Sequence, residues 1–297
     1  MSNQKNASII VATHNRANLL EKTLYAILNQ DFSFNFEIIV INDGSTDNTS
    51  KILQKFKKFK KIKIHNLDKD SGPIVAKNIG IKMARYHIIV IMDDDCIPKK
   101  KWLKNLVSGF TNNVGVVSSH SIYGGTSTAF LKQAIDKVGF LDSEFFINIS
   151  PLSYREDTDF VFRIMNEGYK VVLVKNAKFD HIHKKPRKLR KKISYSLKRL
   201  WIHQLDSLLY KKHPEKTKKF LNIKLGFIRN PINDFKIATG LWYRKKYFSL
   251  SSPQGIVLIQ SKSILHKILI FLGGIFYAFA VKFVRLYGSI KYKKLLI

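Results

Sequence analysis

Three consecutive carboxylates, Asp93, Asp94 and Asp95, directly follow the apolar stretch of residues 88–92. A short run of β-branched residues that ends at a turn signal is typical of a buried strand. Adjacent carboxylates repel one another, so a cation bound beside them would relieve the repulsion. Hard divalent cations such as Mg²⁺ take oxygen ligands and often share them with substrate phosphates. The stretch is therefore a candidate site for a metal and a diphosphate, and a solvated acidic turn is the alternative interpretation.

Strands and helices must place these carboxylates at an accessible edge. Apolar runs predict strands at residues 7–12, 37–42, 61–67, 88–92 and 171–174. Helical spacing predicts helices that start at Leu19 behind an Asn18 cap, at Thr49, after Gly72-Pro73, and near Tyr154 with Phe160, Ile164 and Met165 facing inward. Strands that alternate with helices of this length indicate an α/β fold with a mostly parallel sheet.

Polar residues follow three of the predicted strands. Residues 13–16 follow the first strand, Asp43 ends the second, and Asp93 to Asp95 follow the fourth. In open α/β sheets, ligands bind at the carboxyl ends of the strands. We therefore expect these residues to meet and to form a nucleotide site.

The chain is strongly basic. Its 297 residues contain 52 lysines and arginines against 21 aspartates and glutamates, which gives a net charge of +31. Such a charge favours polyanionic partners: nucleic acid, nucleotide phosphates or an anionic membrane surface. One cysteine excludes an internal disulfide framework and suits a reducing compartment. Residues 1–6 contain no apolar signal-peptide core, so we expect the N-terminal part to be cytoplasmic.

The composition changes near Lys184, and we predict one domain over residues 1–183 and a basic helical region over residues 184–297. Leucines at helical spacing in residues 189–209 indicate a basic amphipathic helix, which suits a membrane surface or ordinary core packing. Residues 264–284 are largely apolar with lysines near both ends. A bilayer span needs about 20 apolar residues. A marginal span, an interfacial segment and a buried helix are the alternatives for this stretch.

Further motifs accompany the three aspartates in a consistent order. They are residues 10–16, 38–47, 72–80, Gly124-Gly125 with Ala129-Phe130, residues 139–142, Glu156-Asp157 and His181. With this order and spacing, roughly residues 7–183 resemble a family 2 glycosyltransferase with the GT-A nucleotide-sugar-binding fold. The expected fold class is thus α/β: a Rossmann-like, mostly parallel sheet flanked by helices, with a C-terminal helical, membrane-associated extension.

The resemblance implies a role for each matching residue. The residues that would bind the nucleotide sugar are Thr13, Asn15, Arg16, Asp43, Lys77, Asp93 and Asp94. Asp95 would bind Mg²⁺ or Mn²⁺ directly, with Asp93 and His181 as further metal ligands. Asp157 would be the general base that deprotonates the acceptor hydroxyl, and Asp159 is a lesser candidate for this role. Glu156 would orient Asp157 or contact the acceptor.

Several of these residues have plainer interpretations. Lys77 stands where the family usually has arginine, so a bidentate phosphate contact becomes a point-charge contact. The acidic residues from Glu156 onward also favour a helix N-terminus. The remaining plain interpretations are a turn former for Asp43, a surface cation for Arg16, a structural role for His181 with His183 as its competitor, and a packing role for Cys96.

The implied reaction is an inverting, metal-dependent transfer of a sugar from a nucleotide diphosphate to an acceptor hydroxyl. UDP is the commonest carrier, and a lipid-linked or cell-surface glycan is the expected acceptor. The chain contains no Q-x-x-R-W signature of processive synthases, which favours non-processive transfer. Together with the basic C-terminal region, these features place the expected enzyme at the cytoplasmic face of the cell membrane.

Two other function classes were weighed against the residues. A nucleotidyltransferase usually has a glycine-rich phosphate loop, and residues 11–16 contain no glycine. A nucleic-acid-binding protein is favoured by the charge alone, since the sequence shows no recognised nucleic-acid-binding motif. We therefore expect no nucleic-acid partner.

Overall fold

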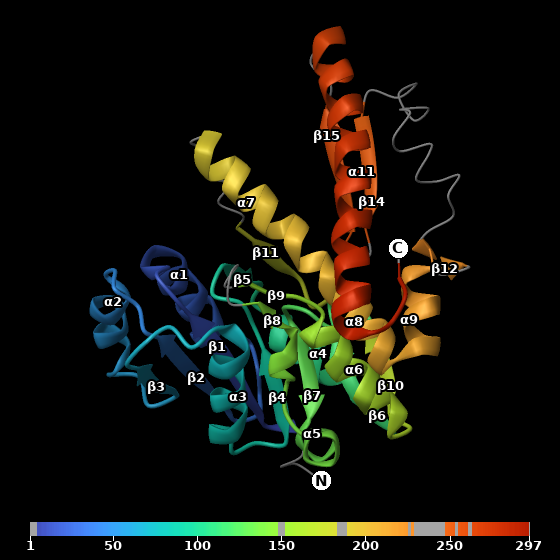
Figure 1. The fold of residues 1–297 in the computed structure, drawn as a ribbon. Coiled ribbons are helices and arrows are strands. Elements are labelled where there is room, and N and C mark those ends of the chain that lie inside the picture. Colours follow the sequence, from blue (N-terminus) through green and yellow to red (C-terminus); the bar gives the residue numbers. More distant parts are fainter. Residues whose placement is uncertain are drawn as a thin grey trace. The chain divides into compact units, whose positions relative to one another are not determined.

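The computed structural model describes residues 5–147, 152–182, 189–224, 227–228, 247–252, 255–260 and 263–296. The chain folds into two compact units, Met1–Lys185 and Pro186–Ile297 (Figure 1). Each unit has its own secondary structure and its own buried side chains, and each is described separately below.

A seven-stranded sheet forms the centre of the first unit, with the strand order β10-β6-β7-β4-β1-β2-β3. The strands are β1 (Ala7–Thr13), β2 (Phe36–Asp43), β3 (Ile62–Leu67), β4 (Ile88–Ile91), β6 (Val114–Ser118), β7 (Thr128–Leu131) and β10 (Lys170–Leu173). β7 runs antiparallel to β4 and β6, and the other neighbouring strands are parallel. The predicted α/β fold with a mostly parallel sheet is confirmed.

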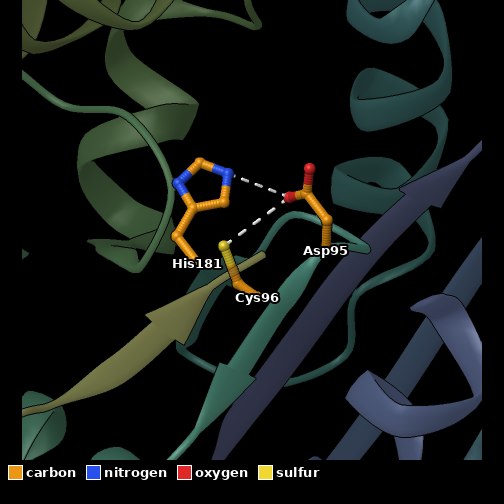
Figure 2. A group of neighbouring side chains, drawn as sticks. All are labelled: Asp95, Cys96 and His181. Carbon is orange, nitrogen blue, oxygen red and sulfur yellow. Dashed lines mark hydrogen bonds and ion pairs between the residues drawn. The ribbon is translucent and has the colours of Figure 1, made fainter. Parts of the chain in front are cut away.

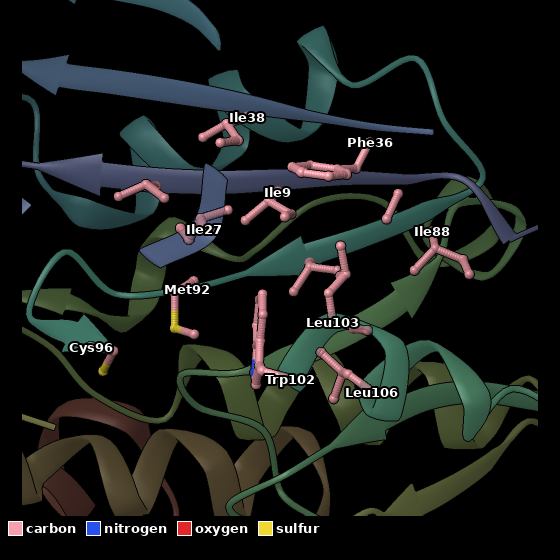
Figure 3. Close-up of a cluster of buried hydrophobic side chains, with 14 of the residues drawn as sticks. Ile9, Ile27, Phe36, Ile38, Ile88, Met92, Cys96, Trp102, Leu103 and Leu106 are labelled. Carbon is pink, nitrogen blue, oxygen red and sulfur yellow. The ribbon is translucent and has the colours of Figure 1, made fainter. Parts of the chain in front are cut away.

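Helices cover the sheet because the strands are apolar on both faces. The helices are α1 (Ala17–Leu28), α2 (Thr49–Phe56), α3 (Pro73–Met83), α4 (Trp102–Ser108), α5 (Lys132–Val138) and α6 (Glu156–Asn166), with a 3₁₀ turn η2 (Ser143–Phe145). One core cluster joins α1, α2 and α4 to alternate residues of β1, β2 and β4, including Ile9, Ile38 and Trp102 (Figure 3). Each fully buried large side chain stabilises the unit by about 1.5–3 kcal/mol.

The opposite residues of the strands pack against other helices. Gly80 of α3 lies so close to β1 that an added Cβ would be 2.5 Å from Ile10 Cγ2. Phe130 of β7 packs on Phe160 of α6, with ring centroids 4.9 Å apart. α3 and α6 are therefore held on the sheet, and these two helices carry Lys77 and the Glu156-Asp157 pair.

Two short antiparallel pairs complete the first unit. β5 (Cys96–Pro98) pairs with β11 (Phe179–His181), and this register sets His181 opposite Cys96. β8 (Phe146–Ile147) pairs with β9 (Leu152–Ser153), just before α6. Neither pair was predicted from the sequence, because two- and three-residue strands give no periodic signal.

Several predicted boundaries differ from the structure. α1 begins at Ala17 with Arg16 at the cap position, so the predicted Asn18 cap was wrong. The Ala17 backbone N–H instead donates to Asp47 Oδ2 at 3.3 Å, from a different loop. Met165 was expected inward on α6 but is exposed. β6 and β7 lie in a region where the sequence pattern predicted no strand.

The second unit contains helices and short strands. Its elements are α7 (Leu189–Trp201), the 3₁₀ turn η3 (Ile202–Gln204), α8 (Leu205–Lys212), α9 (Pro214–Leu221), β12 (Ile223–Lys224), β13 (Phe227–Ile228), β14 (Tyr247–Ser252), β15 (Gly255–Gln260) and α11 (Ile264–Tyr292). The single helix predicted over residues 189–209 is thus interrupted at η3. The strands pair as β12 with β13 and β14 with β15, so the unit is not wholly helical as predicted.

Buried polar contacts hold α11 against η3 and α8. Asp206 is buried and lies 3.2 Å from Arg285 Nε and 3.3 Å from His203 Nδ1. At Gly288, an added Cβ would meet the Gln204 carbonyl oxygen at 2.5 Å, so the two backbones are in close contact. Within the part of the chain that the structure describes, no helix has the length and apolar character needed to cross a membrane.

Candidate active site

Loops from separate strands meet at the carboxyl edge of the parallel sheet. Thr13 and Arg16 follow β1, while Asp94 and Asp95 follow β4. Thr13 Oγ1 donates to Asp94 Oδ2 at 2.7 Å. Arg16 Nη1 lies 3.2 Å from Asp94 Oδ1 and 2.5 Å from Asp95 Oδ2. The structure therefore brings these four predicted site residues into direct contact.

Asn15 connects the loop after β1 to the loop after β2. Its backbone is left-handed, with φ 54°, a conformation that asparagine tolerates better than most residues. Its Oδ1 accepts the backbone N–H groups of Thr46 at 2.8 Å and Asp47 at 3.1 Å. Its own N–H donates to Ser45 Oγ at 3.0 Å. The carboxamide oxygen of Asn15 thus holds the loop after β2 against the loop after β1, and its predicted role in nucleotide binding stays a prediction.

Asp43 ends β2 and is held by the loop that precedes α3. The backbone N–H of Ser71 donates to Asp43 Oδ1 at 2.7 Å. Burial raises the pKa of Asp43 above its ordinary value, with the Ser71 hydrogen bond opposing and the charge of Asp70 adding to the shift. His14 Nδ1 contacts the Asp43 carbonyl oxygen at 2.5 Å. The Asp43 carboxylate therefore ties the end of β2 to the loop before α3, and its predicted contact with a nucleoside stays a prediction.

The three consecutive aspartates have different surroundings. Asp93 is half-buried, and its backbone N–H donates to Thr126 Oγ1 at 3.0 Å. Asp94 is buried, and burial raises its pKa to about 6 although the charge of Arg16 opposes the shift. The Asp94 carbonyl oxygen also accepts from Thr23 Oγ1 of α1 at 2.9 Å. Asp94 is therefore an internal anchor that joins three elements.

Asp95, Cys96 and His181 form a group whose donor atoms all lie within 4.8 Å of one another (Figure 2). His181 Nε2 lies 3.1 Å from Asp95 Oδ1. Burial alone would raise the pKa of Asp95, but the hydrogen bond to His181 and the charge of Arg16 hold it below its ordinary value. The predicted partnership of Asp95 and His181 is thus present in the fold, and His183 lies outside the described residues.

The donor atoms of this group suit a divalent ion. Carboxylate oxygen is the ligand that Mg²⁺ and Mn²⁺ prefer, and neutral imidazole adds a nitrogen ligand. Burial strongly raises the pKa of the Cys96 thiol, so that it stays protonated and is a poor ligand. Asp95 and His181 therefore fit a hard or borderline metal ion, while Cys96 packs beneath them as predicted.

Lys77 of α3 faces the two carboxylates that begin α6. Lys77 Nζ lies 3.4 Å from Glu156 Oε1 and 3.9 Å from Asp157 Oδ1. Ser153 Oγ donates to the same Glu156 oxygen at 2.6 Å. Burial would lower the pKa of Lys77, but the charges of Asp157 and Glu156 raise it well above its ordinary value. Lys77 is therefore charged and is engaged with the acidic pair.

Asp157 is placed to exchange a proton. Its side chain is 21% exposed. Burial raises its pKa to about 7, against the charge of Lys77 and with the charges of Glu156 and Asp93. A base with a pKa near the working pH is the most effective proton acceptor. This supports the predicted choice of Asp157 among the acidic residues of α6.

Asp159, two residues after Asp157, forms an ion pair within α6. It is buried, and Arg163 Nε donates to Asp159 Oδ2 at 2.8 Å. The same guanidinium donates to the carbonyl oxygens of Val138 at 2.7 Å and Phe140 at 2.8 Å. The Asp159–Arg163 pair thus ties α6 to the end of α5, which is a structural role.

The turn between β6 and β7 connects the two groups of carboxylates. Gly124, with φ 89°, lies against α6: an added Cβ would be 2.9 Å from Asp157 Cβ and 3.0 Å from the Asp157 carbonyl oxygen. Two residues later, Thr126 accepts the Asp93 N–H. Sequence reasoning identified the glycines as a turn but missed Thr126, for which the sequence gives no signal. It also missed Ser153, which lies in β9 before α6 and donates to Glu156.

Solved structures with this fold include nucleotide-sugar transferases. The mannosyltransferase PcManGT from Pyrobaculum calidifontis, solved with GDP-Man and Mn²⁺, is similar with a TM-score of 0.59 over 95% of this chain and 87% of that chain, at 14% identity. Residues 1–349 of Staphylococcus aureus TarS, solved with UDP, are similar with a TM-score of 0.52 over 78% of each chain, at 18% identity. At these identities the likeness establishes a GT-A-type fold alone.

The sequence itself shows the family. The profile of glycosyl transferase family 2 matches residues 8–186, more than half of the chain, and the chain belongs to this family. Chondroitin synthase of Escherichia coli is 32% identical over 99 residues, which are 33% of this chain and 14% of that protein. The poly(ribitol-phosphate) beta-N-acetylglucosaminyltransferase TarS of Staphylococcus aureus strain Mu50 is 28% identical over 166 residues, 52% of this chain and 29% of that protein. The match thus covers less than a third of either relative's length.

Proposed function

We propose that this protein transfers a sugar from a nucleotide diphosphate to an acceptor hydroxyl. The observation that carries the proposal is that one turn contacts two clusters of acidic residues, Asp93–Asp95 and Glu156-Asp157. Residues 124–126 contact Asp157, whose pKa is raised to about 7, and also Asp93, beside the candidate metal ligand Asp95. This short turn therefore supports a proposed proton acceptor, Asp157, and a proposed diphosphate site near Asp93 that act together. Membership of glycosyl transferase family 2 supports this function.

The proposed transfer inverts the anomeric carbon. Asp157 takes the proton from the acceptor hydroxyl while that oxygen forms a bond to the anomeric carbon. The bond from this carbon to the diphosphate oxygen breaks on the opposite side, and its electron pair leaves with the nucleoside diphosphate. General base catalysis contributes about 10²- to 10⁴-fold to such a step. Glu156, held by Ser153 and Lys77, keeps the start of α6 in place for this proton transfer.

Asp95 and His181 would hold Mg²⁺ or Mn²⁺, with Asp93, two residues before Asp95 in the chain, as a further ligand. When bound, the ion would supply positive charge that stabilises the departing diphosphate. Two observations support a metal: the oxygen and nitrogen donors converge within 4.8 Å, and a solved protein of similar fold binds Mn²⁺ with GDP-Man. The donor screen described below distinguishes Mg²⁺ from Mn²⁺.

For the donor we propose a UDP-sugar, and for the acceptor a lipid-linked or cell-surface glycan intermediate. TarS structures contain UDP and UDP-GlcNAc, which supports UDP as the carrier. The names of curated relatives support a polymeric acceptor: chondroitin synthase and the poly-beta-1,6-N-acetyl-D-glucosamine synthase of Staphylococcus epidermidis, which is 37% identical over 90 residues. The absence of Q-x-x-R-W from the sequence supports non-processive transfer.

We further propose that the second unit binds the anionic cytoplasmic face of the cell membrane. Residues 186–297 contain 25 lysines and arginines against three acidic residues. Large apolar side chains spaced alternately three and four residues apart are exposed along α11: Leu265, Leu269, Leu272, Phe276, Phe279, Phe283, Leu286 and Ile290. A helix with an apolar stripe on a basic unit suits an anionic lipid interface.

Vesicle flotation tests the membrane proposal. We expect the full chain to float with vesicles that contain phosphatidylglycerol, and to bind pure phosphatidylcholine vesicles much more weakly. Replacing Phe276 and Phe279 with serine should reduce flotation, whereas the matched change of exposed Ile122 and Leu173 in the first unit should not. Equal binding to both vesicle types, or no binding to either, would contradict the proposal.

A donor screen tests the transfer. Purified protein with Mn²⁺ or Mg²⁺ would be incubated with UDP-, GDP- and dTDP-sugars, and nucleotide release and nucleotide-sugar binding would both be measured. We expect metal-dependent binding of one donor and release of its nucleotide, with both lost in Asp95→Ala and release alone lost in Asp157→Asn. If no donor binds in the presence of either metal, the proposed function is wrong.

The other function classes receive no support from the site. A nucleotidyltransferase is disfavoured by the family match over residues 8–186. A nucleic-acid-binding role would place phosphates against the carboxylates of Asp93, Asp94 and Asp95, which repel them in the absence of a metal.

A further inference from the structure

Arg16 contacts two neighbouring carboxylates, the candidate metal ligand Asp95 and the buried Asp94. Its Nη1 lies 2.5 Å from Asp95 Oδ2 and 3.2 Å from Asp94 Oδ1. The Arg16 side chain is 47% exposed, whereas those of Asp95 and Asp94 are 12% and 7% exposed. A half-exposed guanidinium therefore pairs with two nearly buried carboxylates, and its single positive charge offsets one of their two negative charges.

Both carboxylate oxygens of Asp95 are in use. Oδ1 lies 3.1 Å from His181 Nε2, and Oδ2 faces the Arg16 guanidinium. A carboxylate must present a lone pair to a metal ion, and a divalent charge beside Asp95 would repel the guanidinium. Because this repulsion acts between two cations at one carboxylate, a metal ion at Asp95 would compete with Arg16.

Asp94 is also held by hydrogen bonds that do not involve Arg16. Oδ2 of Asp94 accepts from Thr13 Oγ1 at 2.7 Å, and its carbonyl oxygen accepts from Thr23 Oγ1 at 2.9 Å. These bonds come from β1 and α1, so they do not depend on Arg16. Arg16 can therefore leave Asp95 without disturbing the loop that carries both aspartates.

A displaced Arg16 would lie close to the charge that arrives with the metal. Lys77, the residue expected at the diphosphate, is buried and engaged with Glu156 and Asp157. The Arg16 guanidinium is planar and can donate two parallel hydrogen bonds to one phosphate group, which an ammonium group cannot do. Arg16 thus offers the bidentate contact that Lys77 does not supply.

We propose that Arg16 is an exchangeable counter-ion: it neutralises Asp95 in the metal-free protein, and on metal binding it moves to the donor diphosphate. This inference rests on the proposed function. It makes metal and nucleotide binding cooperative, because the guanidinium opposes the metal alone and stabilises the metal together with a diphosphate. Arg16 is thereby a donor-binding residue that also sets the order in which the site fills.

Manganese titration of the full chain tests this exchange. The hexaaquo Mn²⁺ signal in electron paramagnetic resonance reports free metal, first without nucleotide and then with UDP. We expect R16M to bind Mn²⁺ alone about tenfold more tightly than the wild type, since it removes a charge-assisted competitor. In saturating Mn²⁺, R16M should bind UDP about tenfold more weakly, and R16K should fall between the two proteins.

Arg85→Met is the matched control. Arg85 is also a partly exposed arginine beside a buried carboxylate, with Nε 3.5 Å from Glu37 Oε2. Glu37 lies near the start of β2, whereas Asp43 ends that strand. The Arg85→Met variant loses the same charge as R16M but lies away from the candidate site. Its affinities for Mn²⁺ and for UDP should therefore equal those of the wild type. Circular dichroism melting curves would confirm that each variant is folded.

The possible outcomes test the Arg16 exchange separately from the proposed sugar transfer. Unchanged or weaker Mn²⁺ binding by R16M would overturn the competition, and unchanged UDP binding would overturn the move to the diphosphate. Metal-independent transfer by a protein that binds no Mn²⁺ would overturn the exchange but leave the transferase standing. The expected Mn²⁺ and UDP shifts in a protein that transfers no sugar would support the exchange while the proposed function failed.

Discussion

The ammonium group of Lys77 lies 3.4 Å from Glu156 Oε1, although the two residues are 79 positions apart in the chain. Lys77 comes from α3, which packs on β1, and Glu156 begins α6. Asp157 Oδ1 lies 3.9 Å from the same ammonium group. This contact places a fixed positive charge beside the candidate base, so it influences the protonation of Asp157 as well as its position.

The pH dependence of transfer should reflect this cluster. Asp157 must be ionised to accept a proton, and its pKa is raised to about 7. We expect kcat/KM to rise with pH up to about 7 and then to level off, falling about tenfold per unit on the acid side. Because Asp157 interacts with Glu156 and Lys77, the apparent pKa of the acid limb of this profile describes the three residues together. A flat profile between pH 5 and 8 would contradict the assignment.

Lys77 variants should move that acid limb. The Lys77 charge lowers the pKa of Asp157, so Lys77→Met should shift the limb to higher pH. Lys77→Arg keeps the charge and should leave the limb close to that of the wild type. The comparison requires full pH profiles of kcat/KM for all three proteins. A limb that stays in place in Lys77→Met would show that the charge does not act on the base.

Replacement of the base itself should affect the chemical step. Asp157→Asn keeps the shape of the side chain but cannot accept a proton, so kcat should fall about 10²- to 10⁴-fold. Donor affinity should change little, because Asp157 faces Lys77 and Gly124 rather than the loops after β1 and β2. Steady-state kinetics and calorimetric binding of the donor separate these effects. Loss of donor binding in this variant would assign Asp157 to the donor instead.

Asp159 provides the contrasting case on the same helix. Asp159→Asn replaces a charge-assisted bond to Arg163 by a neutral one, which should lower the free energy of unfolding by about 1–3 kcal/mol. Below the unfolding transition, kcat should equal the wild-type value. Urea denaturation and kinetics on the same preparation measure both quantities. A loss of kcat as large as that of Asp157→Asn would make Asp159 the base.

The turn between β6 and β7 can be tested with two neighbouring glycines. In Gly124→Ala, the new Cβ would approach the Asp157 Cβ and carbonyl oxygen within about 3 Å, so the start of α6 must move. We expect kcat to fall by at least about tenfold, since small displacements of a reacting group are costly. Gly125 also has a positive φ, of 104°, but an added Cβ there meets nothing within 4 Å.

Gly125→Ala therefore controls for backbone strain alone. Both substitutions should strain the turn, because alanine is disfavoured at positive φ, and Gly124→Ala adds the contact with Asp157. If Gly125→Ala lowers kcat as much as Gly124→Ala, strain in the turn explains the effect and the contact with Asp157 does not. Thermal melting curves of both variants provide the comparison of stability.

Much of the first unit could be predicted because its signals are local. The continuous apolar runs of β1, β2 and β4 are long enough to show buried strands, and each ends in polar residues. Since parallel strands share a carboxyl edge, the sequence alone placed Thr13, Asp43 and Asp93 at the same edge of the sheet. The family match over residues 8–186 confirmed the predicted family. The family could be predicted because each of its motifs is a short stretch of consecutive residues.

The tertiary structure decided which of these groups touch and what each one does. The β5–β11 register sets His181 beside Asp95, and the packing of α3 on the sheet brings Lys77 to Glu156 rather than leaving it free for a phosphate. The sequence determined the set of charged groups and the sheet edge that collects them. Only the fold determined their pairing, because an ion pair depends on a few ångströms between residues far apart in the chain, and no local pattern encodes that distance.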